Sequence, residues 1–314
     1  MRGIEQIASY IPSGRISNLI PERLAFFGTD EDFVVNKIGV RQRSVRDENE
    51  EASTLAGKAL QKLLQKSGLD PEKIDALVVV TQNPDTNIPH TAAIVHGEAG
   101  LPERCATFDV GLGCSGYVYG LSIMSAFLKE NGLSRGILIT SDPYSKIVDP
   151  EDKNTALLFG DAATATLIGP DPLFSAESFS FGTIGKLHNA LNCKSGKLNM
   201  NGREVFNFAA TKIPCAIENL LEKAALKKED IDAYIFHQGS RYILETIASR
   251  LRISHDRLRM GLENIGNTIS SSIPLLLEEE LDKSGTEKIV LCGFGVGLSY
   301  GSCICKRKNN IKIW

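Results

Sequence analysis

Two hydrophobic patterns alternate along the first half of the chain. Apolar residues recur at helical spacing over residues 54–66 and again over 115–130, which predicts two amphipathic helices. Residues 75–81 instead have the pattern of a strand buried on both faces, since residues 76–80 are all apolar, and a second strand is expected at residues 136–140. The alternation predicts an α/β fold with parallel strands.

The second half of the chain repeats the first. Residues 74–78 match residues 231–235 at an offset of 157, which is half of the 314-residue length, and the preceding helices match at the same offset. Chance similarity between two helix–strand pairs is the alternative, but the matches fall on core positions of both elements. Turn residues cluster just after Gly169, so we expect two domains, residues 1–169 and 170–314, with layered sheets and helices between and outside them.

Composition and charge exclude several classes of function. The chain is 42% hydrophobic and 23% charged with a net charge of −3, so we expect no nucleic-acid partner and no membrane partner. No apolar run reaches the roughly 18 residues of a membrane helix, and the N-terminus lacks the pattern of a signal peptide. The seven cysteines fit neither a disulfide framework nor a zinc site, which favours a reducing cytoplasm.

Cys114 is the first candidate for chemistry. The chain around it predicts a strand ending at Val110, a glycine-rich turn, and a helix starting near Ser115. A thiol at a helix N-terminus lies near free backbone N–H groups, and the helix dipole lowers its pKa. The residue is therefore either a nucleophile or a small hydrophobe buried in a tight turn.

The repeat points to a second group of candidates in the other half. His237 occupies the position equivalent to Val80, at the carboxyl end of a predicted strand, where open α/β sheets bind ligands. Asn267 follows Gly266 where a strand is expected to end and a helix to begin. The glycine-rich bend at residues 293–297 joins two predicted strands and can direct backbone N–H groups at an oxyanion.

Taken together, these motifs resemble the β-ketoacyl-acyl-carrier-protein synthase III family of the thiolase fold. The resemblance covers essentially the whole chain. It rests on Cys114-Ser115-Gly116, Phe159-Gly160-Asp161-Ala162, His237-Gln238, Gly266-Asn267-Thr268 and Gly293-Phe294-Gly295-Val296-Gly297, in this order. The resemblance implies two pseudo-repeated α/β halves in a layered αβαβα arrangement.

The resemblance also implies a mechanism with two half-reactions. Cys114 takes an acyl group from acyl-CoA or an acyl-carrier protein, and the backbone N–H groups of Cys114 and Val296 bind the oxyanion. A malonyl thioester then loses carbon dioxide, and His237 and Asn267 stabilise the enolate that attacks the acyl-cysteine. No metal or bound redox cofactor is implied, since the thioesters are substrates.

The family's CoA-binding positions carry unusual residues here. An adenine-clamping tryptophan is replaced by Phe33, its arginine partner by Lys153, and a channel arginine by Lys37. Ser240 replaces an asparagine, while Phe206 fits the family pattern. The segment from 180 to 198 is short. These changes leave open how well CoA binds and whether the pathway is fatty-acid initiation or a specialised one, such as quinolone or polyketide synthesis.

Two other functions are compatible with these motifs. A non-condensing acyltransferase would form an ester or amide from the acyl-cysteine, and a catalytically silent subunit would only bind a ketosynthase partner. The presence of Cys114, His237 and Asn267 favours condensation.

The resemblance further implies a homodimer, in which the strand at residues 104–110 pairs across a two-fold axis and the loop at 86–89 reaches the partner's acyl pocket.

Overall fold

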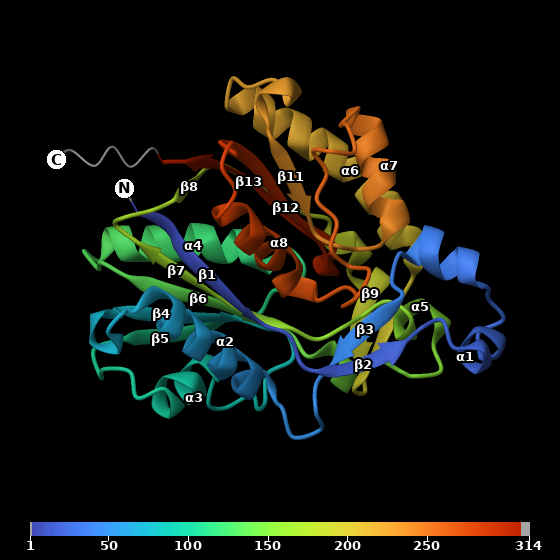
Figure 1. The fold of residues 1–314 in the computed structure, drawn as a ribbon, viewed down its shortest axis with the longest axis horizontal. Helices are drawn as coiled ribbons and strands as arrows, with labels where there is room; N and C mark the ends of the chain where they lie inside the picture. The colour runs from blue at the N-terminus through green and yellow to red at the C-terminus, as the bar shows by residue number, and fades with distance from the viewer. Residues whose placement is uncertain (1, 309–314) are drawn as a thin grey trace.

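One mixed sheet of nine strands runs through the molecule (Figure 1). The structure is a computed structural model that describes residues 2–308. In spatial order the strands are β11 (Ala233–Phe236), β12 (Lys288–Gly295), β13 (Ser299–Arg307), β8 (Phe174–Thr183), β1 (Gly3–Tyr10), β7 (Ala163–Gly169), β6 (Gly136–Ser141), β4 (Ala76–Val80) and β5 (Ala106–Val110).

The strands form two groups with the same arrangement, which confirms the predicted repeat. In the first group β4 is parallel to β6, and β6, β7 and β1 then alternate in direction. In the second, β11 is parallel to β12, and β12, β13 and β8 alternate in the same way. Ala76 and Ala233, which begin β4 and β11, are separated by the offset of the sequence repeat.

The two groups meet where Ile4 of β1 pairs with Phe174 of β8. This contact joins both halves of the chain in one continuous sheet, which the repeat alone does not predict. Gly169 is the last residue of β7, and the division into domains at this residue stays a prediction.

Helices complete five layers, as the αβαβα prediction requires. Between the strand groups lie α4 (Gly116–Glu130) and α8 (Ser272–Leu281). The outer face of the first group is covered by α2 (Ala52–Ser67) and α3 (Thr91–Glu98), and that of the second by α6 (Gly202–Lys223) and α7 (Arg241–Leu251).

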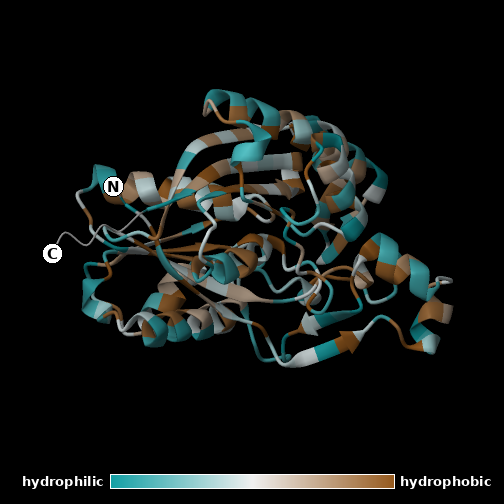
Figure 2. Cartoon of the chain, turned by 45° about the horizontal axis from the view of Figure 1, so that its top comes forward, coloured by the Kyte–Doolittle hydropathy of each residue, from teal (hydrophilic) through white to brown (hydrophobic). Residues whose placement is uncertain are grey.

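The apolar run of β4 follows from these layers. Val78 packs in the central layer with α4, whereas Leu77 and Val79 pack against the outer helices α2 and α3. Because both faces of the strand are covered, all five of its residues are buried. Figure 2 shows the corresponding pattern, with hydrophobic residues along the central strands and hydrophilic residues recurring on the outer helices.

Smaller elements gather on one side of the sheet, at the right in Figure 1. They are the hairpin of β2 (Gly14–Ser17) and β3 (Gln42–Val45), the hairpin of β9 (Leu191–Lys194) and β10 (Lys197–Met200), and the short helices α1 (Pro21–Phe26) and α5 (Lys153–Ala156). No helix within residues 2–308 combines the length and apolar character needed to cross a membrane.

Candidate active site

Cys114 lies in the turn that connects β5 to α4, as expected, and its side chain is only 4% exposed. Glycines at the end of β12 allow the chain to pass close to it. A Cβ atom at Gly293 would collide with the carbonyl oxygen of Cys114 and lie 2.8 Å from the Cα of Ser115. A Cβ atom at Gly295 would lie 2.7 Å from Cys114 Sγ.

The expectation that the helix terminus lowers the thiol pKa is wrong. Burial raises the pKa of Cys114 to about 12, and the nearby carboxyl of Asp142 acts in the same direction. The backbone N–H groups of Val296 and Cys114 hydrogen-bond to the sulfur and offset only part of this rise. Loss of hydration therefore outweighs the helix terminus, and Cys114 is a neutral thiol at physiological pH.

Those two N–H groups are the ones expected to bind the oxyanion, and that role stays a prediction. Both reach the same sulfur atom, one from the turn before α4 and the other from the turn after β12. The φ angle of Val296 is not positive. A valine side chain therefore fits at this position without backbone strain, and a glycine is not needed.

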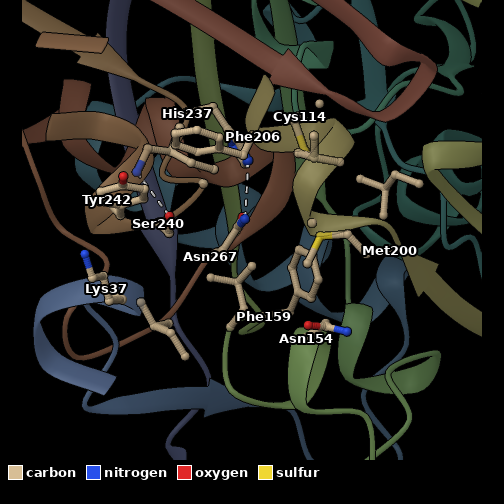
Figure 3. Close-up of a pocket in the computed structure, with 18 of the residues that line it drawn as sticks. Lys37, Cys114, Asn154, Phe159, Met200, Phe206, His237, Ser240, Tyr242 and Asn267 are labelled. Carbon is tan, nitrogen blue, oxygen red and sulfur yellow. Dashed lines mark hydrogen bonds between the residues drawn. The ribbon is translucent and has the colours of Figure 1, made fainter. Parts of the chain in front are cut away.

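His237 directly follows β11, and its backbone N–H donates to the carbonyl of Cys292 in β12. Its ring is held from both sides. Nδ1 lies 2.9 Å from Ser272 Oγ. Nε2 lies 3.3 Å from Asn267 Nδ2, the contact drawn in Figure 3. Burial lowers the pKa of His237 to about 3, so the imidazole is neutral at physiological pH.

Asn267 is oriented by its own loop. Residues 263–265 form a turn rather than the expected strand, and Asn267 makes an isolated bridge with Phe159. The Oδ1 atom accepts a hydrogen bond from the backbone N–H of Ile269 at 3.0 Å. Because the oxygen is occupied in this way, the Nδ2 donor is the atom turned toward His237.

Cys114, His237 and Asn267 line one pocket of about 410 Å³ (Figure 3). They come from three separate segments of the chain, and the structure brings all three together. The remaining wall is largely apolar and includes Phe159 and Phe294, whose ring meets that of His237 edge to face at 5.5 Å.

The five residues predicted to bind CoA or the substrate arm also line this pocket: Phe33, Lys37, Lys153, Phe206 and Ser240. Lys153 Nζ lies 4.8 Å from the centre of the Phe33 ring, so the cation and the ring contact each other directly, and their role in binding adenine stays a prediction. The Ser240 hydroxyl accepts a hydrogen bond from the N–H of Ile243 and caps α7.

The sequence patterns do not predict two residues that contact the site residues, Tyr242 and Ser272. Tyr242 stacks on Phe206 with the ring centres 5.2 Å apart, and Lys37 Nζ lies 4.4 Å from its ring. Its only signal is its position five residues after His237. Ser272 is one of three consecutive serines, and nothing in that run distinguishes the one that contacts the histidine.

Among residues 2–308, no group of three or more His, Cys, Asp or Glu side chains is arranged to hold a metal ion. The buried carboxyl of Asp142 accepts hydrogen bonds that connect two neighbouring segments of the chain. Its oxygens accept hydrogen bonds from the Gln82 N–H at 2.7 Å and the Ser270 hydroxyl at 2.5 Å. Burial raises the pKa of Asp142 to about 6.

Comparison with known proteins identifies the family. The sequence profile described as 3-Oxoacyl-[acyl-carrier-protein (ACP)] synthase III matches residues 108–185, and that of its C-terminal part matches residues 221–307. The Staphylococcus aureus β-ketoacyl-[acyl-carrier-protein] synthase III is 36% identical over 312 residues, covering 97% of this chain and 98% of that protein. The corresponding Lactococcus lactis protein is 34% identical over 321 residues, covering 96% and 98%.

Solved structures agree with these matches. The β-ketoacyl-[acyl carrier protein] synthase III of Thermus thermophilus has a TM-score of 0.89 and 30% identity, covering 98% of this chain and 99% of that chain. A priming ketosynthase of the R1128 polyketide pathway has a TM-score of 0.89 at 24% identity, which shows a shared fold. The chain therefore belongs to the 3-oxoacyl-[acyl-carrier-protein] synthase III family of thiolase-fold acyltransferases.

Proposed function

We propose that this enzyme joins an acyl group carried on Cys114 to a malonyl thioester, with loss of carbon dioxide and formation of a β-ketoacyl product. The observation that carries the proposal is the convergence of Cys114, His237 and Asn267 in one pocket. The backbone N–H groups of Cys114 and Val296 both lie beside the sulfur, and the thioester oxygen that becomes the oxyanion during acylation would be next to that sulfur.

The second half-reaction needs donors for an enolate oxygen. Neutral His237 and the Nδ2 group of Asn267 lie side by side, 3.3 Å apart, so one oxygen atom can accept from both. A non-condensing transfer to an alcohol or amine has no enolate to stabilise. The presence of both donors therefore favours condensation over that alternative.

The mouth of the pocket suits a phosphate-bearing arm. Lys37 and Lys153 each lie over an aromatic ring, Tyr242 and Phe33 respectively, so two cations flank the entrance. We propose thioesters of CoA or of an acyl-carrier protein as the substrates, with no resident cofactor. Lysine is a point charge, so it binds phosphate without the planar stacking that an arginine would add.

We also propose that the enzyme is a homodimer. β5 is an edge strand of the sheet, and its free edge can pair with the same strand of a second copy. Ile88 is 88% exposed in the loop that precedes α3, as expected of a side chain that a partner covers. A cytoplasmic location is likewise proposed; none of the seven cysteines forms a disulfide.

Mass spectrometry of the intact protein tests the function. After exposure to a panel of acyl-CoA and acyl-carrier thioesters, we expect one acyl group per chain, and peptide mapping should place it on Cys114. Malonyl thioester should then release carbon dioxide. Cys114→Ser should remain folded and lose turnover, because the serine has no matched base to deprotonate it.

The other outcomes separate the alternatives. An acylated Cys114 that releases no carbon dioxide with malonyl thioester, but transfers its acyl group to an amine or alcohol, would indicate the non-condensing enzyme. A wild-type protein that no donor acylates would indicate the silent subunit. An acyl group on Cys105 or Cys215 would contradict the assignment of the nucleophile.

A further inference from the structure

A second pocket lies behind the catalytic loop. Its volume is about 360 Å³, and its inner wall includes Gln238, Thr268 and Ser272. Its rim includes the exposed residues Lys66 and Asp282, so the pocket opens at the surface. His237 and Asn267 line the first pocket but not this one.

Ser272 is the link between the two pockets. It lines the second pocket, and its Oγ lies 2.9 Å from Nδ1 of His237, whose ring lines the first. The same Oγ lies 2.9 Å from the carbonyl oxygen of Ile269. The hydroxyl therefore has two acceptors at equal distance: it donates either to Nδ1 or, when Nδ1 carries the proton, to the carbonyl.

The reaction also needs a proton from outside the buried site. Condensation breaks the bond between the acyl carbon and Cys114 Sγ, and the electron pair stays on sulfur. Carbon dioxide leaves the malonyl carboxylate without a proton, so regeneration of the thiol consumes one proton per turnover. Cys114 and His237 are 4% and 3% exposed, and the arm of the proposed thioester substrate would occupy the first pocket in front of them.

We propose that Ser272 connects His237 to water in the second pocket and passes protons in both directions, so that the histidine alternates between its two neutral tautomers. This inference rests on the function proposed above. It assigns Ser272 as a positioning residue and proton carrier that acts through His237, and it assigns the second pocket as the route by which protons enter and leave.

In the first half-reaction His237 starts with its proton on Nδ1. Cys114 Sγ attacks the thioester carbon while Nε2 takes the thiol proton, and Nδ1 gives its proton to Ser272, whose own proton passes to water in the second pocket. The leaving thiolate takes a proton from water at the mouth of the first pocket. His237 is left with its proton on Nε2, the tautomer that can donate to an enolate.

In the second half-reaction the transfers run in reverse. The enolate carbon bonds to the acyl carbon, and Sγ leaves with the electron pair and takes the Nε2 proton. Nδ1 takes the hydroxyl proton of Ser272, which is replaced by one from water. His237 returns to the Nδ1–H tautomer, and one proton has entered, as the overall reaction requires. Because protons move in and out together, the imidazole stays neutral.

A buried hydroxyl in the second pocket is a place for that water. The Thr268 side chain is 1% exposed, and its Oγ1 has no hydrogen-bond partner within the described part of the chain. A buried hydroxyl of this kind takes an ordered water as its partner. Thr268 lines the same pocket as Ser272, so such a water would lie on the proposed route.

The first test follows the tautomer of His237. The chain has five histidines, so a protein labelled with 15N-histidine and assigned with His237→Gln has few ring signals to resolve. We expect the His237 signals to show a proton on Nδ1 in the free enzyme and on Nε2 after acylation of Cys114 by the acyl-CoA that labels it. The same tautomer in both states would overturn the proposal.

The second test uses Ser272→Ala and separates the half-reactions. Removal of the hydroxyl should slow both Cys114 acylation and the return of free thiol by about tenfold to a hundredfold, and should reduce the solvent isotope effect on thiol return. Ser271→Ala is the matched control, because Ser271 Oγ donates to the Ala162 carbonyl at 3.1 Å and does not contact His237. It should lose stability but keep both rates within a few fold.

The outcomes distinguish this proposal from the proposed function. Unchanged rates in Ser272→Ala, or equal losses in Ser271→Ala, would overturn the relay while leaving the condensing function intact. If the wild-type enzyme neither acylates Cys114 nor releases carbon dioxide, the proposed function fails, and the relay fails with it.

Discussion

At the scale of single residues, the site divides its chemistry between the two halves of the chain. Cys114 and its own N–H belong to the first half, whereas His237, Asn267 and the N–H of Val296 belong to the second. The sulfur receives backbone donors, and in the proposed mechanism the enolate receives side-chain donors. Substitution of one side-chain donor should therefore affect the two half-reactions differently.

Asn267→Ala tests this division. The backbone donors at Cys114 survive the change, so acylation should continue near the wild-type rate, while malonyl decarboxylation should fall by about a hundredfold to a thousandfold. The double variant with His237→Ala should lose less than the sum of the two single effects, because both donors act on one oxygen. Both steps should be measured separately, and equal losses in the two would contradict the division.

Burial of neutral His237 makes stability depend on pH. Its folded pKa of about 3 lies below the unfolded value of 6.5, so its contribution to stability is present above pH 6.5 and is lost as pH falls toward 3. Between pH 7.5 and pH 5 the loss should be about 2 kcal/mol. Urea unfolding of wild type and His237→Gln at both pH values measures it, and an equal loss in both proteins would rule out this origin.

At the scale of elements, the reactive turn depends on the close passage of β12. The Cβ of an alanine at position 293 would meet backbone atoms of Cys114 and Ser115, which have no freedom to move aside. β12 can therefore pass this close to the turn before α4 only because residue 293 is a glycine, which has no Cβ. The same passage brings the N–H of Val296 to the sulfur.

Gly293→Ala should therefore lower the free energy of unfolding by about 1–3 kcal/mol and slow Cys114 acylation. Gly57→Ala is the control, since Gly57 lies inside α2 and a Cβ there would meet nothing within 4 Å. That change should raise stability by about 0.5–1 kcal/mol and leave acylation unchanged. Urea unfolding and acyl-enzyme formation measure both variants; a neutral Gly293→Ala would show that the turn can relax.

At the scale of the whole molecule, the sheet leaves β5 unpaired on its outer side. All five residues of this strand are partly buried rather than fully enclosed, and Phe108 packs edge to face on Phe127 of α4. The strand also leads directly into the turn that carries Cys114. An interface at β5 would therefore support the catalytic turn as well as cover the edge.

We expect a homodimer at micromolar concentration, measurable by light scattering. Thr107→Pro, in the middle of β5, should weaken the dimer, because proline removes a backbone donor from the edge. Thr54→Ala, on the outer helix α2, should leave the dimer intact. A monomeric wild-type protein would contradict both the interface and the reach of Ile88 into a partner's pocket.

Elements whose causes are local can be predicted from the amino-acid sequence. The spacing of apolar residues predicts α4 over 115–130 and it forms over Gly116–Glu130, while the apolar run at 75–81 becomes β4. Hydrophobic periodicity is a property of neighbouring residues, so no other part of the chain is needed to read it. The offset of 157 likewise predicts that β4 and β11 are equivalent, and the strand pairing agrees.

Properties that depend on distant segments of the chain could be read only from the folded structure. The helix terminus predicts a lowered thiol pKa for Cys114. Residues from both halves of the chain bury the sulfur, however, and this burial raises the thiol pKa. The pairing of Ile4 with Phe174 joins two sheets into one, and the contact of Ser272 with His237 spans 35 positions of sequence. Burial and hydrogen bonding depend on which segments surround a group, and local sequence does not specify its distant neighbours.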